Sequence, residues 1–355
     1  MKRIIVSDVH MGAGRSFKEG YSGHVYDWLS EDEAHSFAAF LQLLINDNTV
    51  NEIILLGDIM DTWVCPVEEV PPTFDEIINA ENNRDIVNNL KNLAAQEAKK
   101  LIYIPGNHDV TVTKEFLESN FRGIVFQAEY STGSLLAQHG HEYTMFCAPD
   151  PKNDPENRLP LGYYISRVAA TNAAKTGSNN SFRYYLDEFI GELSKSKTLI
   201  NAIFDAIVKG SNLDDNTEIK MYSGSMRIKD VKNRYARLYK QWDANSHFVN
   251  AREALVAEIN ALSSVPWKLS SEKNYKIIIF GHTHDKYLGE LPKYDADENT
   301  SLYANSGTWC DYREKGRKFT FIESEEKKEE DKHFVRLKSW ENDNAKLLQE
   351  EAMTL

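Results

Sequence analysis

Five short apolar runs, each followed within a few residues by Asp, Asn or His, constrain the fold of this chain more than any other feature of its sequence. The runs are Arg3 to Ser7, Glu52 to Leu56, Leu101 to Ile104, Ser134 to Gln138 and Lys276 to Phe280. They consist mostly of Ile, Leu, Val, Tyr or Phe, which is typical of strands that are buried on both faces.

Helical periodicity separates several of these runs. From Glu33 to Ile45, apolar residues recur three and four positions apart, and the stretch from Ile86 to Ala98 repeats the pattern. Because strand and helix patterns alternate, the sequence predicts an α/β sandwich.

The segment from Phe146 to Asn274 has a different pattern. It contains long helical stretches and few strand signals, and prolines and serines mark its borders. We predict a core formed by residues 1–145 and 275–342, with an inserted helical module at 146–274. The aromatic residues of the insert either line an apolar pocket or form the insert's own core.

Strand patterns resume beyond the insert. Ser301 to Asn305 predicts a further strand, and Lys318 to Glu323 with His333 to Trp340 predicts a hairpin. Residues 343–355 are interpreted as a C-terminal tail, and a short helix is expected at this end of the chain.

Composition and charge narrow the class of protein. The 355-residue chain has a formal net charge of −13, whereas nucleic-acid-binding surfaces usually have a basic face. Its three cysteines are far apart and suggest neither a disulfide framework nor a cysteine-based zinc site. The apolar run in the opening MKRIIVSDVH is too short for the core of a signal peptide. No later segment reaches the roughly 18 apolar residues of a membrane span. We therefore expect a cytoplasmic protein.

Side chains that can bind metals cluster where the predicted strands end. They are Asp8, His10, Asp58, Asp61, Asn107, His108, Asp109, His139, His141, His282 and His284. Since sites in open α/β sheets form outside the carboxyl ends of strands, we expect these groups to meet at one edge. Carboxylate, imidazole and amide groups together favour Mn, Fe or Zn over Ca or Mg.

These segments resemble the motif set of the calcineurin-like metallophosphoesterase superfamily. The matching segments are Asp8–His10, Gly57–Asp61, Gly106–Asp109, His139–His141 and Gly281–His284, and Asn305–Thr308 resembles the loop that follows the last motif. The resemblance covers residues 1–145 and 275–323, and it implies a four-layer α/β/β/α sandwich with the insert as a helical cap.

The resemblance also implies a centre of two divalent metal ions. The first ion would be held by Asp8, His10, Asp58 and His284, and the second by Asp58, Asn107, His139 and His282, with Asp58 shared. Two ions roughly 3.5–4 Å apart can activate a hydroxide for attack on phosphorus. We expect Mn²⁺, with Fe or Zn as alternatives.

Further residues take roles from the same resemblance. His108 resembles the histidine that contacts the phosphoryl group or protonates the leaving oxygen, and Asp61 would orient it. Asp109 is either a loop residue or a support for the ligands. His141 either supports a ligand or contacts substrate.

The substrate class is less constrained. Protein phosphatases of the superfamily carry Arg-Gly after the second motif. In this chain Asp61 is followed by Thr62-Trp63 instead, so protein dephosphorylation is disfavoured. The nearest resemblance is to the bacterial UDP-2,3-diacylglucosamine hydrolase-like branch, which has Arg in place of His108 and a shorter insert. We expect a small phosphorylated substrate, nucleotide-sugar-like or lipid-linked, cleaved at a phosphodiester, phosphomonoester or pyrophosphate bond.

The insert is expected to cap the site and select the substrate. Arg167, Asn172 and Lys175 are candidate phosphate-binding residues, with a solvated helix face as the alternative reading. Two other functions remain open. One is a nuclease or cyclic-nucleotide phosphodiesterase on the same fold, which the acidic charge disfavours. The other is a metal-binding scaffold without activity, which the intact ligand set disfavours.

Overall fold

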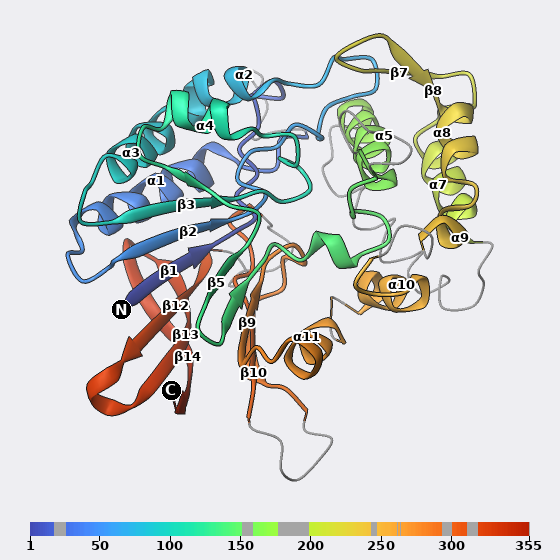
Figure 1. Cartoon of the computed structure of the whole chain (residues 1–355). Helices are drawn as coiled ribbons and strands as arrows, with labels where there is room; N and C mark the ends of the chain where they lie inside the picture. Colours follow the sequence, from blue (N-terminus) through green and yellow to red (C-terminus); the bar gives the residue numbers. More distant parts are fainter. Residues whose placement is uncertain are drawn as a thin grey trace.

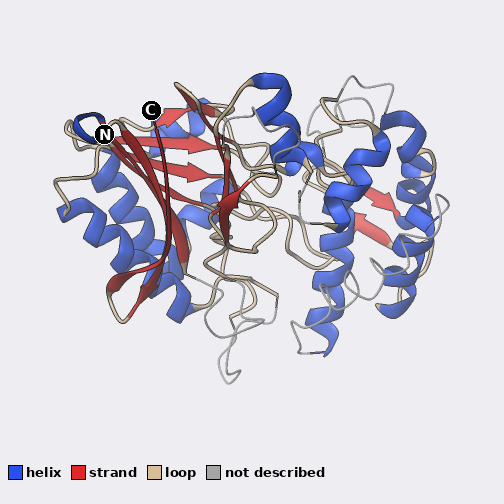
Figure 2. Cartoon of the chain, turned by 90° about the horizontal axis from the view of Figure 1, so that it is seen from below, coloured by secondary structure: helices blue, strands red, loops and turns tan. Residues whose placement is uncertain are grey.

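Two β-sheets face each other, with helices on both outer sides (Figure 2). The computed structural model describes residues 1–17, 26–150, 159–176, 199–242, 247–260, 262, 264–292, 300–310 and 319–354. This arrangement confirms the predicted α/β/β/α sandwich. Four aromatic residues assigned to the insert, Phe182, Tyr184, Tyr185 and Phe189, lie outside the described ranges.

The first sheet contains the amino terminus. Its order in the described residues is β14-β13-β12-β1-β2-β3-β4. The strands are β1 (Lys2–Val6), β2 (Glu52–Leu56), β3 (Lys100–Ile104), β4 (Val125–Phe126), β12 (Thr320–Lys327), β13 (Lys332–Glu341) and β14 (Asn344–Thr354). Strands β1 to β4 are parallel, so their carboxyl ends point the same way, and β12 pairs with β1 in the antiparallel sense.

The second sheet has the order β10-β11-β9-β6-β5 in the described residues. Its strands are β5 (Tyr130–Thr132), β6 (Leu135–Ala137), β9 (Ile277–Phe280), β10 (Tyr287–Glu290) and β11 (Leu302–Asn305). β6, β9 and β11 are parallel to one another. β6 precedes the insert and β9 follows it, so the insert leaves and re-enters the sandwich at neighbouring strands.

Alternating side chains of the parallel strands divide the core into layers. In β2, Ile54 and Leu56 pack between the two sheets, whereas Ile53 and Leu55 pack under the outer helices. This explains why the strands read as continuous apolar runs, since both of their faces are buried.

Helices α1 (Glu31–Asn46) and α3 (Arg84–Ala94) cover the outer face of the first sheet (Figure 1). α1 begins at a capping box in which Ser30 and Glu33 satisfy each other's backbone amides. Shorter helices flank them, namely α2 (Phe74–Asn79), η1 (Glu81–Asn83) and α4 (Lys114–Asn120). None of the helices within the described ranges is long and apolar enough to cross a membrane.

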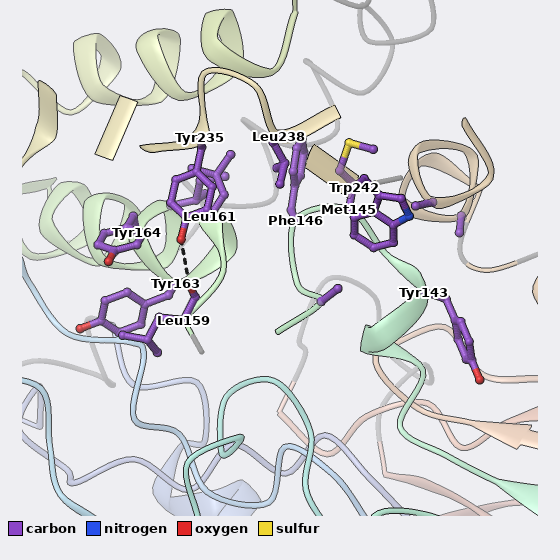
Figure 3. Packing of buried hydrophobic residues seen from close by; sticks show 14 of the residues in the cluster. Tyr143, Met145, Phe146, Leu159, Leu161, Tyr163, Tyr164, Tyr235, Leu238 and Trp242 are labelled. Atoms are coloured by element: carbon purple, nitrogen blue, oxygen red, sulfur yellow. Dashed lines mark hydrogen bonds between the residues drawn. The ribbon is translucent and has the colours of Figure 1, made fainter. Parts of the chain in front are cut away.

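The apolar side chains of the insert belong to one buried cluster that continues into the sandwich, where it includes Leu136 and Phe280. The described elements of the insert are α5 (Leu161–Thr176), α7 (Leu199–Gly210), β7 (Glu218–Lys220), β8 (Ser225–Arg227), α8 (Ile228–Tyr235) and α9 (Leu238–Trp242). Tyr163, Tyr164 and Trp242 are buried in this cluster, and the hydroxyl of Tyr235 donates to the carbonyl of Leu159 at 2.7 Å (Figure 3). The aromatic side chains described here therefore form core. The β7–β8 pair is a short hairpin that the helical patterns did not predict.

One helix inside the predicted insert packs on the sandwich. α11 (Val265–Lys273) lies beside β9 in Figure 1, and its Val265 and Leu269 share an apolar cluster with Phe280 of that strand. The preceding helix, α10 (Ala251–Ile259), contacts α9 instead. The fourth layer of the sandwich therefore comes from the 146–274 segment.

The predicted terminal helix is wrong, because Asn344–Thr354 forms strand β14 beside β13. Asn342 and Asp343 both have positive φ, at 49° and 58°, which is the backbone of a tight two-residue hairpin turn. Most of β14 is exposed, so a helix here would have had no apolar face to bury. The hairpin of β12 and β13 is as predicted.

Candidate metal centre

The predicted ligands follow strands of both sheets. Asp8 and His10 follow β1, Asp58 follows β2, Asn107 follows β3, His139 follows β6, and His282 and His284 follow β9. Five of these have positive φ, between 53° and 69°, namely Asp8, His10, Asp58, His282 and His284. Such backbone is strained for residues other than glycine, and it persists at sites where the surroundings hold it for function.

The two carboxylate oxygens of Asp8 have different surroundings. Oδ2 accepts hydrogen bonds from the Ser7 hydroxyl and from the backbone amide of His282, the latter at 3.0 Å. Oδ1 is buried without a hydrogen-bond partner among the described residues, and Nε2 of His284 lies 3.3 Å from it. An unsatisfied buried carboxylate oxygen is costly, so Oδ1 is placed to bind a cation.

The tautomer of His10 follows from its neighbours. Nδ1 lies 2.9 Å from Oδ2 of Asp61 and therefore carries the proton, which leaves the lone pair of a neutral ring on Nε2. Burial and the nearby His108 lower the pKa of His10, which favours the neutral ring. Nε2 lies 3.2 Å from Nε2 of His284 and 3.7 Å from Oδ2 of Asp58. Atoms with lone pairs converge here.

His139 and Asp58 meet in the same way. Nδ1 of His139 lies 2.8 Å from the carbonyl of Leu56 and donates to it, so the second ring nitrogen is the acceptor when the ring is neutral. This Nε2 lies 3.1 Å from Oδ2 of Asp58. Burial opposes the charged form of His139, but Asp58 and Asp8 raise its pKa to about 9. In the absence of a metal ion, a proton on Nε2 then lies between this atom and Oδ2 of Asp58. A metal ion binding here would displace that proton.

The orientation of His282 is fixed by Thr144. The Thr144 hydroxyl lies 3.0 Å from the carbonyl of His141 and donates to it, so it accepts from Nε2 of His282 at 3.1 Å. The lone pair of His282 is then on Nδ1, and burial lowers the pKa of this ring to about 3. The amide oxygen of Asn107 is buried and accepts no hydrogen bond from the described residues.

Two glycines allow the strand ends to approach each other. A Cβ at Gly57, which has a φ of 83°, would lie 2.4 Å from Nδ1 of His139. A Cβ at Gly106 would lie 2.2 Å from Oδ1 of Asp58. Both positions require glycine, because a methyl group would push a predicted ligand away.

The donor set fits divalent metal ions. Contacts join Asp8, His10, Asp58, His139, His282 and His284, and Asp58 belongs to two of the three compact groups of metal-capable atoms in the described residues. Carboxylate and imidazole groups with converging lone pairs are the ligands that such ions take. The division of these residues between two ions stays a prediction.

His108 lies beside this set and is held from two directions. Its backbone amide donates to Oδ1 of Asp58 at 2.8 Å, and its Nδ1 lies 2.9 Å from Oδ2 of Asp61. Its ring stacks on Trp63, with centroids 4.4 Å apart. Oδ1 of Asp61 accepts from the backbone amides of Trp63 and Val64, so the carboxylate is fixed in turn.

Asp109 organises the loops around the site. It is fully buried and accepts from the backbone amides of Ile59 and Gly106 and from the hydroxyl of Tyr103. The acceptor network joins the loop after β2 to the loop after β3. Of the two readings for Asp109, this geometry favours the loop residue.

Arg167 is placed away from the predicted phosphate role. It is fully buried, and all five of its guanidinium N–H groups are used within the chain. The acceptors are the carbonyl oxygens of Cys65, Pro66, Glu69 and Lys220 and the hydroxyl of Tyr163. We therefore reassign Arg167 from phosphate binding to holding α5 against the loop after β2.

The other candidate substrate residues lie at different places. His141 is buried, with its ring centroid 5.4 Å from that of His139. Asn172 is buried in α5, and the exposed Lys175 donates to the carbonyl of Ser211 within the insert. Their contact with substrate stays a prediction.

Sequence patterns missed three residues at the site. The ring of Trp28 lies 4.4 Å from that of His10, and Trp63 stacks on His108. Cys310 lies near His10 and His284. Trp28 precedes a helix and gives no local signal, whereas Trp63 and Cys310 lie just past two of the recognised motifs.

A family model for calcineurin-like phosphoesterases matches residues 1–286. No curated protein matches the chain significantly. One similar solved structure is a protein from Streptococcus pneumoniae described as a predicted phosphoesterase, which is 10% identical, with 100% of this chain and 97% of that chain covered and a TM-score of 0.33. Another is Vps29 of Entamoeba histolytica complexed with zinc, at 10% identity, 100% and 99% coverage and a TM-score of 0.33. A third is GAP50 of Plasmodium, an anchor in the inner membrane complex. It is 10% identical, with 100% of this chain and 89% of that chain covered and a TM-score of 0.38. Likenesses at this level say nothing about function. The family match spans well over half of the chain and includes all five motifs, and the chain therefore belongs to the calcineurin-like phosphoesterase family.

Proposed function

We propose that this chain hydrolyses a phosphoric ester or pyrophosphate bond with two divalent ions held around Asp58. The observation that carries the proposal is the contact between His139 and Asp58. The hydrogen bond to Leu56 makes Nε2 the acceptor of a neutral His139 ring, and this atom faces Oδ2 of Asp58 at 3.1 Å. A cation between two acceptors stabilises a contact that would otherwise need a proton.

The converging side chains divide into two sets that share Asp58. Asp8, His10 and His284 complete the first set. His139 and His282 belong to the second, and we add Asn107 to it because its buried amide oxygen has no hydrogen-bond partner among the described residues. Bound divalent ions would supply charge to polarise a phosphoryl oxygen and lower the pKa of a coordinated water. The chain contributes fixed tautomers, buried carboxylates and strained strand ends that hold this geometry in advance.

His108 is suited to protonate the leaving oxygen. Burial opposes its charged form, but the carboxylates of Asp61 and Asp58 raise the pKa of His108, which favours the protonated ring. Trp63 and Asp61 fix the orientation of the ring. General acid catalysis by such a group contributes about 10²–10⁴-fold to the rate.

The insert is positioned to influence substrate choice. The ring of Trp63 lies between the metal centre and the insert. It stacks on His108, and its centroid is 5.9 Å from that of Tyr163 in α5. In Figure 1 the carboxyl ends of β1, β2 and β3 point toward the insert helices. This placement supports a cap over the site. The substrate we propose is small and phosphorylated, nucleotide-sugar-like or lipid-linked.

A substrate panel tests the proposal. Metal-depleted protein would be reloaded with Mn²⁺ and offered an aryl monoester, an aryl diester, a cyclic nucleotide and a nucleotide-diphosphate sugar. We expect hydrolysis of at least one, abolished by chelation and absent in Asp58→Asn. Folded, reloaded protein that cleaves none of them, or activity that survives in Asp58→Asn, would contradict the proposal.

A further inference from the structure

Cys310 lies within the candidate metal centre, although no cysteine-based site is expected from the sequence. Its sulfur forms a compact group with ring nitrogens of His10 and His284, in which all three atoms lie within 4.8 Å of one another. The side chain is 2% exposed. Both histidines belong to the set proposed for the first ion.

The segment that carries Cys310 is fixed to the ligand Asp8. The hydroxyl of Thr308 and the backbone amide of Trp309 both donate to the carbonyl of Asp8, each at 3.0 Å. One residue further, the amide of Cys310 donates to the hydroxyl of Thr308 at 3.2 Å. The position of the thiol is therefore set by the same backbone that presents Asp8.

A second observation points to a ligand at this place. Oδ1 of Asp8 is fully buried, has no hydrogen-bond partner among the described residues, and lies 3.3 Å from the imidazole of His284. Oδ1 of Asp8 and the sulfur of Cys310 thus both lie beside His10 and His284. By contrast, Cys65 and Cys147 belong to none of the metal-capable groups found in the described ranges.

We propose that Cys310 binds the first metal ion as a thiolate, together with Asp8, His10, Asp58 and His284. The proposal rests on the metal centre of the proposed function. On binding, the S–H bond breaks, a sulfur–metal bond forms and the proton passes to solvent. Zinc binds sulfur at about 2.3 Å and nitrogen at about 2.0–2.1 Å, and the group of Cys310, His10 and His284 is compact enough to hold one ion.

A thiolate changes which metal this site prefers. Soft sulfur ligands select Zn or Fe–S type chemistry, whereas Mn²⁺ favours oxygen ligands. The first ion is then Zn²⁺ or Fe²⁺, while the second set, made of oxygen and nitrogen donors, holds no thiol. This inference revises the expected Mn²⁺ for one of the two positions.

Cobalt absorption tests the proposal without any substrate. The metal-depleted full chain would be titrated with Co²⁺, and the near-ultraviolet sulfur-to-cobalt charge-transfer band would be followed together with the visible d–d bands. We expect the band in the wild type and in the control Cys147→Ser, and its loss in Cys310→Ser and Cys310→Ala. Both Cys310 variants should still show d–d absorption, because the other ligands remain, and this also reports that they are folded.

Three results would overturn the assignment. Cobalt bound by the wild type without a charge-transfer band would sink the thiolate ligand and leave the proposed phosphoesterase function standing. The same follows if Cys310→Ser retains the band. If the wild type binds no cobalt at all, the metal centre itself fails, and the proposed function falls with it.

A competition experiment gives a second readout. Loss of the thiolate should weaken Zn²⁺ binding about 10–100-fold, by analogy with the loss of other groups that support metal sites. Mn²⁺ affinity should change by less than about threefold, because a manganese ion gains little from sulfur. Equal weakening of both metals would indicate that Cys310 only packs against the site, which contradicts the proposal.

Discussion

Nδ1 of His108 lies 2.9 Å from Oδ2 of Asp61. The same carboxylate oxygen lies 2.9 Å from Nδ1 of His10, and the other oxygen is held by two backbone amides. One carboxylate thus orients both the candidate acid and a predicted metal ligand. Changing His108 should therefore affect turnover alone, whereas changing Asp61 should affect both turnover and the metal ligand His10.

His108→Ala should keep the metals and lose turnover. The ring contacts Asp61 and Trp63, and its pKa is raised, but its neighbour Asn107 is the predicted ligand. We expect kcat to fall about 10²–10⁴-fold. Metal content measured on the same preparation serves as the control, and loss of a metal would move His108 into the ligand set.

Asp61→Ala should weaken metal binding and also lower turnover. Without its carboxylate, His10 no longer has a fixed tautomer, so the first ion should bind about 10–100-fold more weakly. Turnover should fall at least as far as in His108→Ala. A variant that keeps full metal affinity would show that Asp61 orients His108 alone.

Gly57→Ala should disrupt metal binding, whereas Gly133→Ala should not. Both glycines have positive φ, so both variants carry left-handed strain of about 1–2 kcal/mol. Only at Gly57 would the new methyl group meet His139, at 2.4 Å, since Gly133 has nothing within 4 Å. Metal affinity measured by titration should drop at least about 10-fold for Gly57→Ala alone. Equal affinities in the two variants would contradict the close approach.

Arg167→Met should lower stability rather than substrate affinity. The change leaves several buried carbonyl groups without their donor, at about 1–3 kcal/mol each. Thermal unfolding should shift down by many degrees, whereas Lys175→Met on the same helix should shift it little. An unchanged Tm together with a raised KM would restore the phosphate-binding reading of Arg167.

The parts of the fold that were predictable are those in which local pattern and packing agree. β2 reads as a buried strand and is one, and Asp58 follows it at the sheet edge. β14 was missed because its exposed residues have no periodic apolar face, and only the Asn342-Asp343 turn indicates the hairpin.

The site was predictable where short motifs encode it and not where contacts are distant in sequence. Ligands such as Asp8 and His282 belong to recognisable segments. Trp28 reaches the same place from the segment before α1, and nothing local in the sequence indicates it, whereas Cys310 follows the Asn305–Thr308 loop but belongs to no recognised motif. The sequence does not separate the readings of Arg167, because a cation on a helix looks the same whether it meets a phosphate or buried carbonyl groups.

The central claim is that Asp58 joins two metal positions. The most direct test is the metal content of freshly purified, unchelated protein, determined by elemental analysis for the wild type and Asp58→Asn. We expect two divalent ions per wild-type chain, because the two proposed ligand sets share this carboxylate. Asp58→Asn should bind them at least about 10-fold more weakly and lose them on dialysis. One ion or none in the wild type, or two ions retained by Asp58→Asn, would contradict the account.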